Sequence, residues 1–170
     1  RETIAANEWV VKGGNKASSY VTPSTNNMTI EKNAKQEKFA EADGLIGGSP
    51  VYYGQPNGAL LSIIQRAFFS NSANIAGKPA AAIAVCRRGG ATATFEALNM
   101  PFQMLNMPIV TSQYWNIVYG RSEGEAALDR EGMQTMRTLA RNMAWMLKMR
   151  EKGLEEAPQR ERKTMMHFIR

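Results

Sequence analysis

The sequence predicts an α/β domain built on a parallel β-sheet, and two observations lead to this prediction. First, two segments in a row read as strand, loop and helix, one from Leu45 to Phe68 and the next from Ala80 to Leu98. Consecutive units of this kind place their strands parallel, since each helix returns the chain across the face of the sheet. Second, the long amphipathic stretch from Asp129 to Lys152 provides a helix that can cover that sheet.

Length and composition fit one folded domain. The chain has 170 residues, of which 44% are hydrophobic and 21% charged, which is enough apolar material to bury one sizeable core. We expect a single domain over 1–170, with a divergent or incomplete N-terminal part at 1–30 and a C-terminal tail at 153–170.

Several classes of protein are excluded by composition. The longest apolar run, Ala80–Cys86, is far shorter than the roughly 20 residues of a membrane helix, and no basic segment followed by an apolar stretch opens the chain. We therefore expect a soluble, cytoplasmic protein. Cys86 is the single cysteine and cannot alone form a disulfide, a zinc site or an iron–sulfur site, so no metal is expected. The net charge of +6 comes from dispersed Lys and Arg, which indicates a solvated surface rather than a nucleic-acid-binding one.

The first forty residues contain many turn formers and few clear elements. Trp9–Val11 reads as a short strand, and helix formers over Glu31–Ala42 predict a surface helix. A strand at Leu45–Ile46 then leads through Gly47–Val51 into Tyr52–Gly54, a loop whose glycines and proline prevent a helix from continuing.

The next strand of the chain and the helices before and after it have clear patterns. Ala80–Val85 predicts a buried strand, because no polar residue alternates along it. The loop Arg87–Thr92 comes next, and a helical stretch runs from about Thr94 to Leu98. The helix before this strand has apolar residues at the spacing of one helical face, and these are Leu60, Ile63, Ile64, Ala67 and Phe68.

The last part of the chain predicts one more strand and the final helix. Ile109–Thr111 reads as a strand that ends in the polar and aromatic loop Ser112–Asn116. Asp129 is a suitable N-cap for a helix that ends near Lys152. The apolar face of this helix consists of Met136, Leu139, Ala140, Met143, Met146 and Leu147.

Three loops are expected at the carboxyl edge of the strands, where open parallel sheets bind their ligands. In Ser49–Gly58, adjacent tyrosines are joined to a proline and glycines, which suits a flat aromatic ligand; a plain turn with two surface tyrosines explains the loop equally well.

In Arg87–Thr94, paired glycines permit a close backbone approach and the arginines attract an electron-rich oxygen or a phosphate. An ordinary turn is the commoner explanation of such a loop on its own. Gln113–Asn116 offers an aromatic wall and an amide, although Trp115 is equally suited to the core or to a subunit contact.

Two further residues favour structural roles. His167 is the single histidine and stands near the end of the chain, so no Ser-His-Asp arrangement and no catalytic side chain is predicted. Cys86 precedes Arg87, whose charge could lower the thiol pKa, but a small core residue is the favoured interpretation.

Eight motifs follow one another along most of the chain: Ala42–Ile46, Gly48–Tyr53, Gly77–Pro79, Arg87–Thr94, Ser112–Asn116, Gly132–Arg137, Asn142–Trp145 and Phe168–Arg170. Together they closely resemble the NAD(P)H-dependent FMN reductases of the flavodoxin-like superfamily, which are related to iron–sulfur flavoproteins. The resemblance extends from near Glu31 to the end of the sequence.

This resemblance implies a flavodoxin-like, three-layer parallel sheet with FMN at the carboxyl edge of the strands. It also implies hydride transfer from NAD(P)H to the flavin and on to a quinone-like or other acceptor, in a homodimer or homotetramer. The flavin carries the chemistry, so no side chain need act as acid, base or nucleophile. The implied cofactor-binding residues are Ser49, Pro50, Val51, Tyr52, Tyr53 and Gly54 in the first loop, and Arg88, Gly89, Gly90 and Ala91 in the second.

The sequence departs from the family pattern in two places. Nothing before Trp9 matches the apolar first strand and the Ser/Thr-rich phosphate loop, so the sheet is expected to lack both, and Trp9–Lys16 resembles the second strand and its exit. Gly14–Met28 has no cysteine where related proteins carry a cysteine cluster, so no iron–sulfur cluster is expected. A flavin-free flavodoxin-like binding or structural module therefore stays open as the alternative function.

Overall fold

A computed structural model of the chain describes residues 9–11, 19–20, 39, 41–153 and 161. Its elements are β1 (Trp9–Val11), β2 (Ser19–Tyr20), β3 (Gly44–Pro50), α2 (Gly58–Ser70), α3 (Ser72–Ile75), β4 (Ala80–Cys86), α4 (Ala91–Met104), β5 (Ile117–Tyr119), the 3₁₀ helix η1 (Glu125–Leu128) and α5 (Arg130–Glu151).

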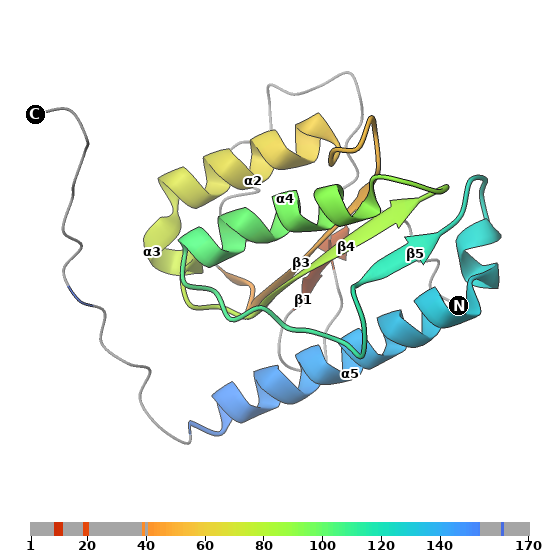
Figure 1. Cartoon of the computed structure of the whole chain (residues 1–170). Coiled ribbons are helices and arrows are strands. Elements are labelled where there is room, and N and C mark those ends of the chain that lie inside the picture. Colours follow the sequence, from red (N-terminus) through yellow and green to blue (C-terminus); the bar gives the residue numbers. More distant parts are fainter. Residues whose placement is uncertain (1–8, 12–18, 21–38, 40, 154–160, 162–170) are drawn as a thin grey trace, which may run out of the picture.

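The strands form one sheet in the order β2-β1-β3-β4-β5. The parallel core consists of β3, β4 and β5, and β3 pairs with β4 over six positions from Leu45 opposite Ala80 to Pro50 opposite Val85. Helices α2 and α4 cover one face of the sheet and α5 covers the other, so the fold has three layers (Figure 1). The predicted α/β class with a parallel sheet is confirmed.

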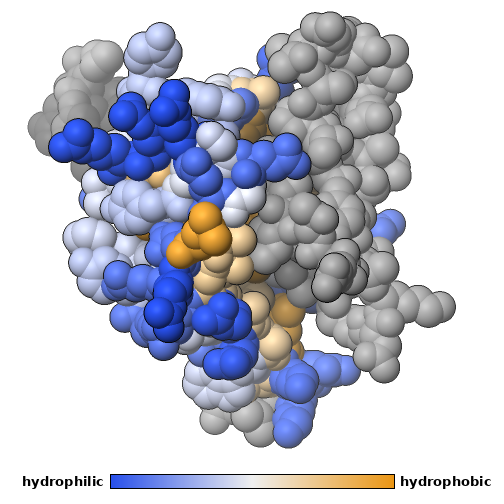
Figure 2. All heavy atoms as spheres, turned by 90° about the vertical axis from the view of Figure 1, so that its right-hand side faces the viewer, coloured by the Kyte–Doolittle hydropathy of each residue, from blue (hydrophilic) through white to orange (hydrophobic). Residues whose placement is uncertain are grey.

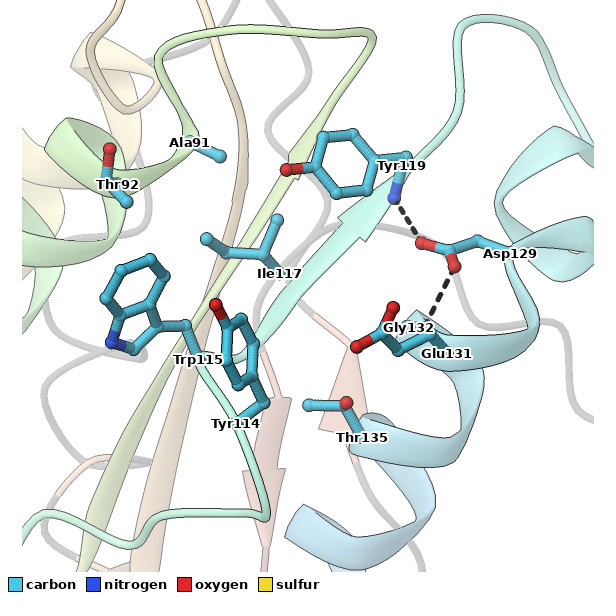
Figure 3. A pocket seen from close by; sticks show the side chains of 10 residues that line it. All are labelled: Ala91, Thr92, Tyr114, Trp115, Ile117, Tyr119, Asp129, Glu131, Gly132 and Thr135. Carbon is cyan, nitrogen blue, oxygen red and sulfur yellow. Dashed lines mark hydrogen bonds between the residues drawn. The ribbon is translucent and has the colours of Figure 1, made fainter.

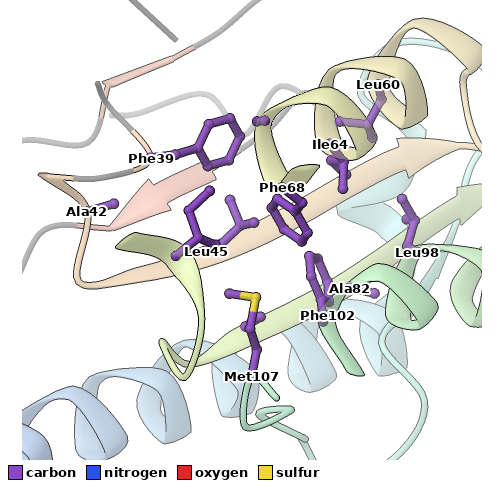
Figure 4. Packing of buried hydrophobic residues seen from close by; sticks show 13 residues of the cluster. Phe39, Ala42, Leu45, Leu60, Ile64, Phe68, Ala82, Leu98, Phe102 and Met107 are labelled. Atoms are coloured by element: carbon purple, nitrogen blue, oxygen red, sulfur yellow. The ribbon is translucent and has the colours of Figure 1, made fainter. Parts of the chain in front are cut away.

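Successive side chains along each strand point to opposite faces of the sheet, and they therefore enter two separate cores. Leu45, Ala80 and Ala82 pack with residues of α2 and α4, whereas Ile46 and Ala81 pack with Leu139 and Met143 of α5. The alanines of β4 are completely buried, and their small side chains let helices approach both faces of the sheet closely. In the larger core, Phe68 stands between Phe39 and Phe102, with ring centroids 6.2 and 5.9 Å away (Figure 4).

The helical predictions hold for α2 and α5. In α2, the predicted face is buried at Leu60, Ile64, Ala67 and Phe68. In α5, Asp129 is the N-cap, as predicted, and its Oδ1 accepts a hydrogen bond of 2.9 Å from the Gly132 amide. Among the described residues, no helix is both long enough and apolar enough to cross a bilayer.

Two elements are longer than their local sequence predicts. Strand β3 continues through Gly47–Pro50, where the sequence predicts a loop, because pairing with β4 provides partners that outweigh the poor strand propensity of glycine and proline. Helix α4 begins at Ala91, ahead of the expected Thr94, and runs to Met104 with Pro101 inside it.

The predicted strand Ile109–Thr111 is wrong. Ile109 makes an isolated bridge to Ala80, then the chain leaves the sheet and pairs again only where Ile117 lies opposite Ala84. Between these two pairings the chain advances eight positions, from 109 to 117, while β4 advances four, from 80 to 84. The extra length forms the segment Thr111–Asn116, which we call the edge excursion. It lies beside the middle of the sheet and not at the carboxyl end of a strand.

The N-terminal strand is present as predicted, but its predicted place in the sheet is wrong. The resemblance implies the strand order 2-1-3-4-5, with Trp9–Val11 as the second strand and an empty position between it and β3. In the structure Trp9–Val11 lies directly beside β3 and pairs antiparallel with Gly44–Ile46. Most of the helix expected over Glu31–Ala42 lies outside the described residues. Phe39 and Ala42, at its end, are buried in the core.

Asp129 joins α5 to the edge of the sheet, because its Oδ2 also accepts a 2.8 Å hydrogen bond from the Tyr119 amide. We predict that Asp129→Ala lowers the free energy of unfolding by about 1–3 kcal/mol, through loss of the cap and of the bond to β5. Urea denaturation measures this loss. Glu131→Gln, in the same helical turn, is the control and should change stability by less than about 0.5 kcal/mol. Equal effects of the two substitutions would contradict the assigned role of Asp129.

Candidate functional site

The loops that follow β3 and β4 touch each other at the carboxyl edge of the sheet (Figure 1). A Cβ atom added to Gly90 would stand 2.8 Å from the Gly54 Cα and 3.0 Å from the Val51 Cγ1. Gly90 also has a φ of +86°, a left-handed conformation that favours glycine. Both constraints explain why a glycine occupies this position, and they bring the two predicted ligand-binding loops to one point.

The first loop ends in a tight turn that exposes two tyrosines. The Tyr52 amide donates to the Gln55 carbonyl and the Gln55 amide donates to the Tyr52 carbonyl, both at 2.9 Å. Tyr53 and Gly54 between them have φ values of +51° and +75°. A left-handed tyrosine is unusual and costs conformational energy. The turn holds the Tyr53 ring fully in solvent, with the Tyr52 side chain half exposed beside it.

The base of the first loop is rigid. The Ser49 side chain is fully buried, and its Oγ accepts a 2.8 Å hydrogen bond from the Asn57 amide and donates one of 2.8 Å to the Pro50 carbonyl. Asn57 in turn caps α2, where its Oδ1 accepts from the Ala59 amide at 2.9 Å. Ser49 thus orients the loop from below, while the tyrosines are the groups that reach the surface.

The second loop is open and positively charged. Arg87, Arg88 and Gly89 are exposed, and Gly90 starts α4 without a side-chain cap or an acidic residue in the first turn. The amides of that turn therefore keep free hydrogen-bonding capacity next to the loop contact. Nothing lies within 4 Å of the Cβ position at Gly54 or at Gly89. The two loops fit a flat ligand that carries hydrogen-bond acceptors, because backbone is exposed on both sides of the contact.

Cys86 ends β4 directly below this loop and is buried. Burial raises the pKa of its thiol, and a hydrogen bond from the Arg88 backbone amide offsets this only in part. A raised thiol pKa does not suit a nucleophile at neutral pH. The prediction that Cys86 is a core residue is confirmed.

A cavity of about 300 Å³ lies beyond this site, along the outer edge of β5. In Figure 3, Ile117 of β5 lies between the ring of Tyr119 on one side and the rings of Trp115 and Tyr114 on the other. The first turn of α4 and the first turns of α5 complete the walls. The lining residues are Ala91, Thr92, Tyr114, Trp115, Ile117, Tyr119, Asp129, Glu131, Gly132 and Thr135.

Hydrogen bonds hold the edge excursion against α5. The Thr138 hydroxyl donates to the Gln113 Oε1 at 2.9 Å, and the Asn142 side-chain amide donates to the Thr111 carbonyl at 2.8 Å. Within the excursion, the Tyr114 and Trp115 rings stand 5.2 Å apart at an interplanar angle of 45°. The aromatic wall of the cavity is therefore supported from the helix.

The sequence predicts part of this arrangement. It indicates an aromatic wall from Tyr114 and Trp115, and both line the cavity. It also indicates an amide from the loop Gln113–Asn116. The Gln113 Oε1 accepts from the Thr138 hydroxyl, and Asn116 is buried with its Oδ1 2.7 Å from the Ser112 hydroxyl. Sequence reasoning misses Tyr119 and Thr135. On this side of the cavity the sequence draws attention only to Asp129, and it identifies that residue as a helix cap.

Comparison with known proteins gives a family match and a curated relative. A family model described as NADPH-dependent FMN reductase matches residues 15–121. An iron–sulfur flavoprotein of Methanocaldococcus jannaschii is 29% identical over 126 residues, which are 68% of this chain. The chain spans 64% of the length of that relative.

Two solved structures share the fold. The Trp repressor binding protein from Bacillus subtilis has a TM-score of 0.50 at 17% identity, with 66% of this chain and 74% of that chain covered. RosB with bound 8-demethyl-8-formylriboflavin-5'-phosphate has a TM-score of 0.55 at 16% identity, with 82% and 67% covered. The predicted resemblance and the flavodoxin-like fold class are confirmed.

Gly90→Ala tests the contact between the loops. We predict that it lowers the free energy of unfolding by about 2 kcal/mol or more, because alanine is strained at φ +86° and its methyl group overlaps Gly54. Urea denaturation provides the measurement. Gly89→Ala is the matched control: nothing occupies the space around that Cβ, so its effect should stay within about 0.5 kcal/mol. Equal stability of the two variants would contradict both the left-handed conformation of Gly90 and its contact with Gly54.

The raised thiol pKa of Cys86 makes stability depend on alkaline pH. The unfolded chain releases the thiol proton at a lower pH than the folded chain, so the free energy of unfolding falls as pH rises above about 8.5. Cys86→Ala removes this contribution. Urea denaturation between neutral and alkaline pH should therefore show a steeper decline for the unaltered chain than for the variant; parallel declines would contradict the burial of Cys86.

Proposed function

Because the chain belongs to the NADPH-dependent FMN reductase family, we propose that it binds FMN at the touching loops Ser49–Gly58 and Arg87–Thr94, which we call the joined loops. It would then transfer hydride from NAD(P)H through the flavin to a quinone-like or other acceptor. The observation that carries this proposal is the backbone contact of Gly90 with Gly54. It unites the loops of β3 and β4 into one open surface at the edge where parallel sheets bind ligands.

The residues present fit the ring of FMN. In the first loop these are Pro50, Val51, Tyr52, Tyr53 and Gly54, with Ser49 as the buried support of their conformation. In the second loop they are Arg88, Gly89, Gly90 and Ala91. Free amides of the α4 first turn can donate to the carbonyl oxygens of the ring, and the tyrosine side chains can cover its edge or face. The described part of the chain includes no Ser/Thr- and Gly-rich loop beside β3 that would hold the phosphate.

When bound, FMN would supply the two-electron chemistry, accepting hydride from a reduced nicotinamide and passing electrons to the acceptor. The protein's contribution is binding and electrostatics. Loop segments Ser49–Gly58 and Arg87–Thr94 contain two arginines and no Asp, Glu or His. The exposed guanidinium groups of Arg87 and Arg88 favour negatively charged ligands at this edge, which include the phosphates of a nicotinamide dinucleotide.

A homodimer or homotetramer is part of the same proposal. Large apolar side chains are exposed on the outer faces of three helices, namely Phe69, Met100, Met104 and Trp145. Met100 and Met104 are four residues apart on α4 and so share one helical face, and a contiguous apolar face left in solvent is a candidate subunit contact. Sedimentation or light scattering of the purified chain measures its mass directly, and a monomer at micromolar concentration would contradict this part of the proposal.

A titration of the purified chain with FMN tests the site. We predict visible absorbance bands of bound flavin, and an affinity roughly 2- to 10-fold weaker for Tyr53→Ala, because an exposed ring that packs on the ligand is lost. Tyr114→Ala is the matched control, since Tyr114 is also exposed but lies in the edge excursion. Its affinity for FMN should not change.

A folded chain that binds no FMN at any concentration would contradict the proposal and would leave the flavin-free binding module. An equal loss of affinity in Tyr53→Ala and Tyr114→Ala would also contradict the assignment of the ring to these loops.

A further inference from the structure

We propose that the cavity at the outer edge of β5 binds a small, flat organic cation. This site is separate from the joined loops, and the proposal does not require flavin. It rests on three observations: the volume of the cavity, the arrangement of its aromatic rings and the charge of its walls.

The volume limits the occupant to a small molecule. At about 300 Å³ the cavity is at the lower end of the range of small-molecule sites. It can accept one or two fused aromatic rings but not a whole flavin nucleotide or a nicotinamide dinucleotide. The cavity is therefore not the FMN site, although the two share Ala91 as a wall residue.

The rings provide flat apolar surfaces around a buried floor. Trp115 and Tyr119 are both about half exposed, and Ile117 between them is buried (Figure 3). Large aromatic side chains left in solvent at one place cost hydrophobic free energy, which a bound apolar molecule recovers. Thr138 and Asn142 donate hydrogen bonds to the edge excursion and hold the aromatic wall, so little ordering is needed when a ligand binds.

The side chains of the walls favour a cation, whereas the first turns of α4 and α5, which also line the cavity, favour an anion through their backbone amides. Of the ten lining residues, Asp129 and Glu131 are acidic and none is a lysine or arginine. Two backbone amides already donate to the Asp129 carboxylate, one from Tyr119 and one from Gly132. Glu131 is exposed at the rim and can face a ligand's positive charge. Aromatic faces add to this preference, because the negative face of an indole or phenol ring attracts a cation.

Figure 2 shows the end of the molecule where the strands terminate, and hydrophobic residues form a narrow strip there between hydrophilic ones. The arginines of the second loop belong to the joined loops and do not line the cavity. An anion is thus favoured at the joined loops, and a cation in the cavity.

Isothermal titration calorimetry of the full chain with N-methylquinolinium tests the proposal, with quinoline as the neutral probe and naphthalene-2-sulfonate as the anionic one. At pH 7.5 we expect the cation to bind more tightly than quinoline, and the sulfonate not to bind. Tetramethylammonium should bind more weakly than N-methylquinolinium, since it lacks a flat face; equal or tighter binding would contradict a site for flat cations.

Two variants and a matched control locate the binding. Trp115→Ala should weaken N-methylquinolinium by about 2- to 30-fold, and Trp115→Phe, which keeps a ring, should weaken it less. Glu131→Gln should weaken the cation by about 2- to 5-fold and leave quinoline unchanged. Trp145→Ala removes an exposed tryptophan that lies on α5, outside the cavity, and should leave the binding of N-methylquinolinium unchanged.

Several results would overturn the proposal. These are equal binding of cation and neutral probe, no effect of either Trp115 variant, or loss of binding in Trp145→Ala. Concentration-dependent association of the chain that Trp115→Ala abolishes, without any probe binding, would show that a second copy covers the rings. Parallel titration with FMN separates this proposal from the proposed function, because a chain that binds the cation but not FMN contradicts only the latter.

Discussion

The parallel pairing of β3 with β4 is the interaction on which both candidate sites depend. Its register places Pro50 opposite Val85, and the pairing continues one residue further through a 2.9 Å hydrogen bond from the Val51 amide to the Val85 carbonyl. The two strands therefore end level with each other. Loops that leave a sheet at the same level must share the space above it, and in this fold they share it through two glycines in contact. A shift of register by one residue would invert the side chains of β3 between the two cores and separate the loops.

Helix α4 connects the two sites because each of them uses its first turn. Its N-cap, Gly90, touches the loop of β3, while Ala91 and Thr92 form a wall of the cavity at β5. Different charges surround the two ends of this arrangement, with arginines beside the joined loops and carboxylates beside the cavity. An anionic cofactor and a small cationic molecule could thus occupy adjacent positions that share Ala91 as a wall residue. If FMN binds as proposed, an occupant of the cavity would lie against the residue that follows the loop contact.

Sequence patterns predict the elements that follow a local rule and miss those that depend on a partner. The periodicity of α2 and α5 and the unbroken apolar run of β4 are visible in the chain itself, as is the cap at Asp129. The edge excursion is not, because the extra residues between Ile109 and Ile117 can be recognised only against the register of β4. Likewise, the glycine pair indicates a close backbone approach near Gly90, but nothing local identifies Gly54 as the neighbour. Thr135 has no signal at all, since a threonine on a helical face is read as ordinary helix surface.

The joined loops, as we propose, hold a flavin that a nicotinamide can reduce. The most direct measurement is the visible spectrum of the FMN-loaded chain under anaerobic conditions, before and after NADPH or NADH is added. We expect the oxidised flavin bands to bleach at a rate well above that of free FMN, and to return when an acceptor such as a quinone is supplied. If FMN stays bound and oxidised with either nucleotide in excess, the chain is a flavin-binding protein without reductase activity, which contradicts the proposed function.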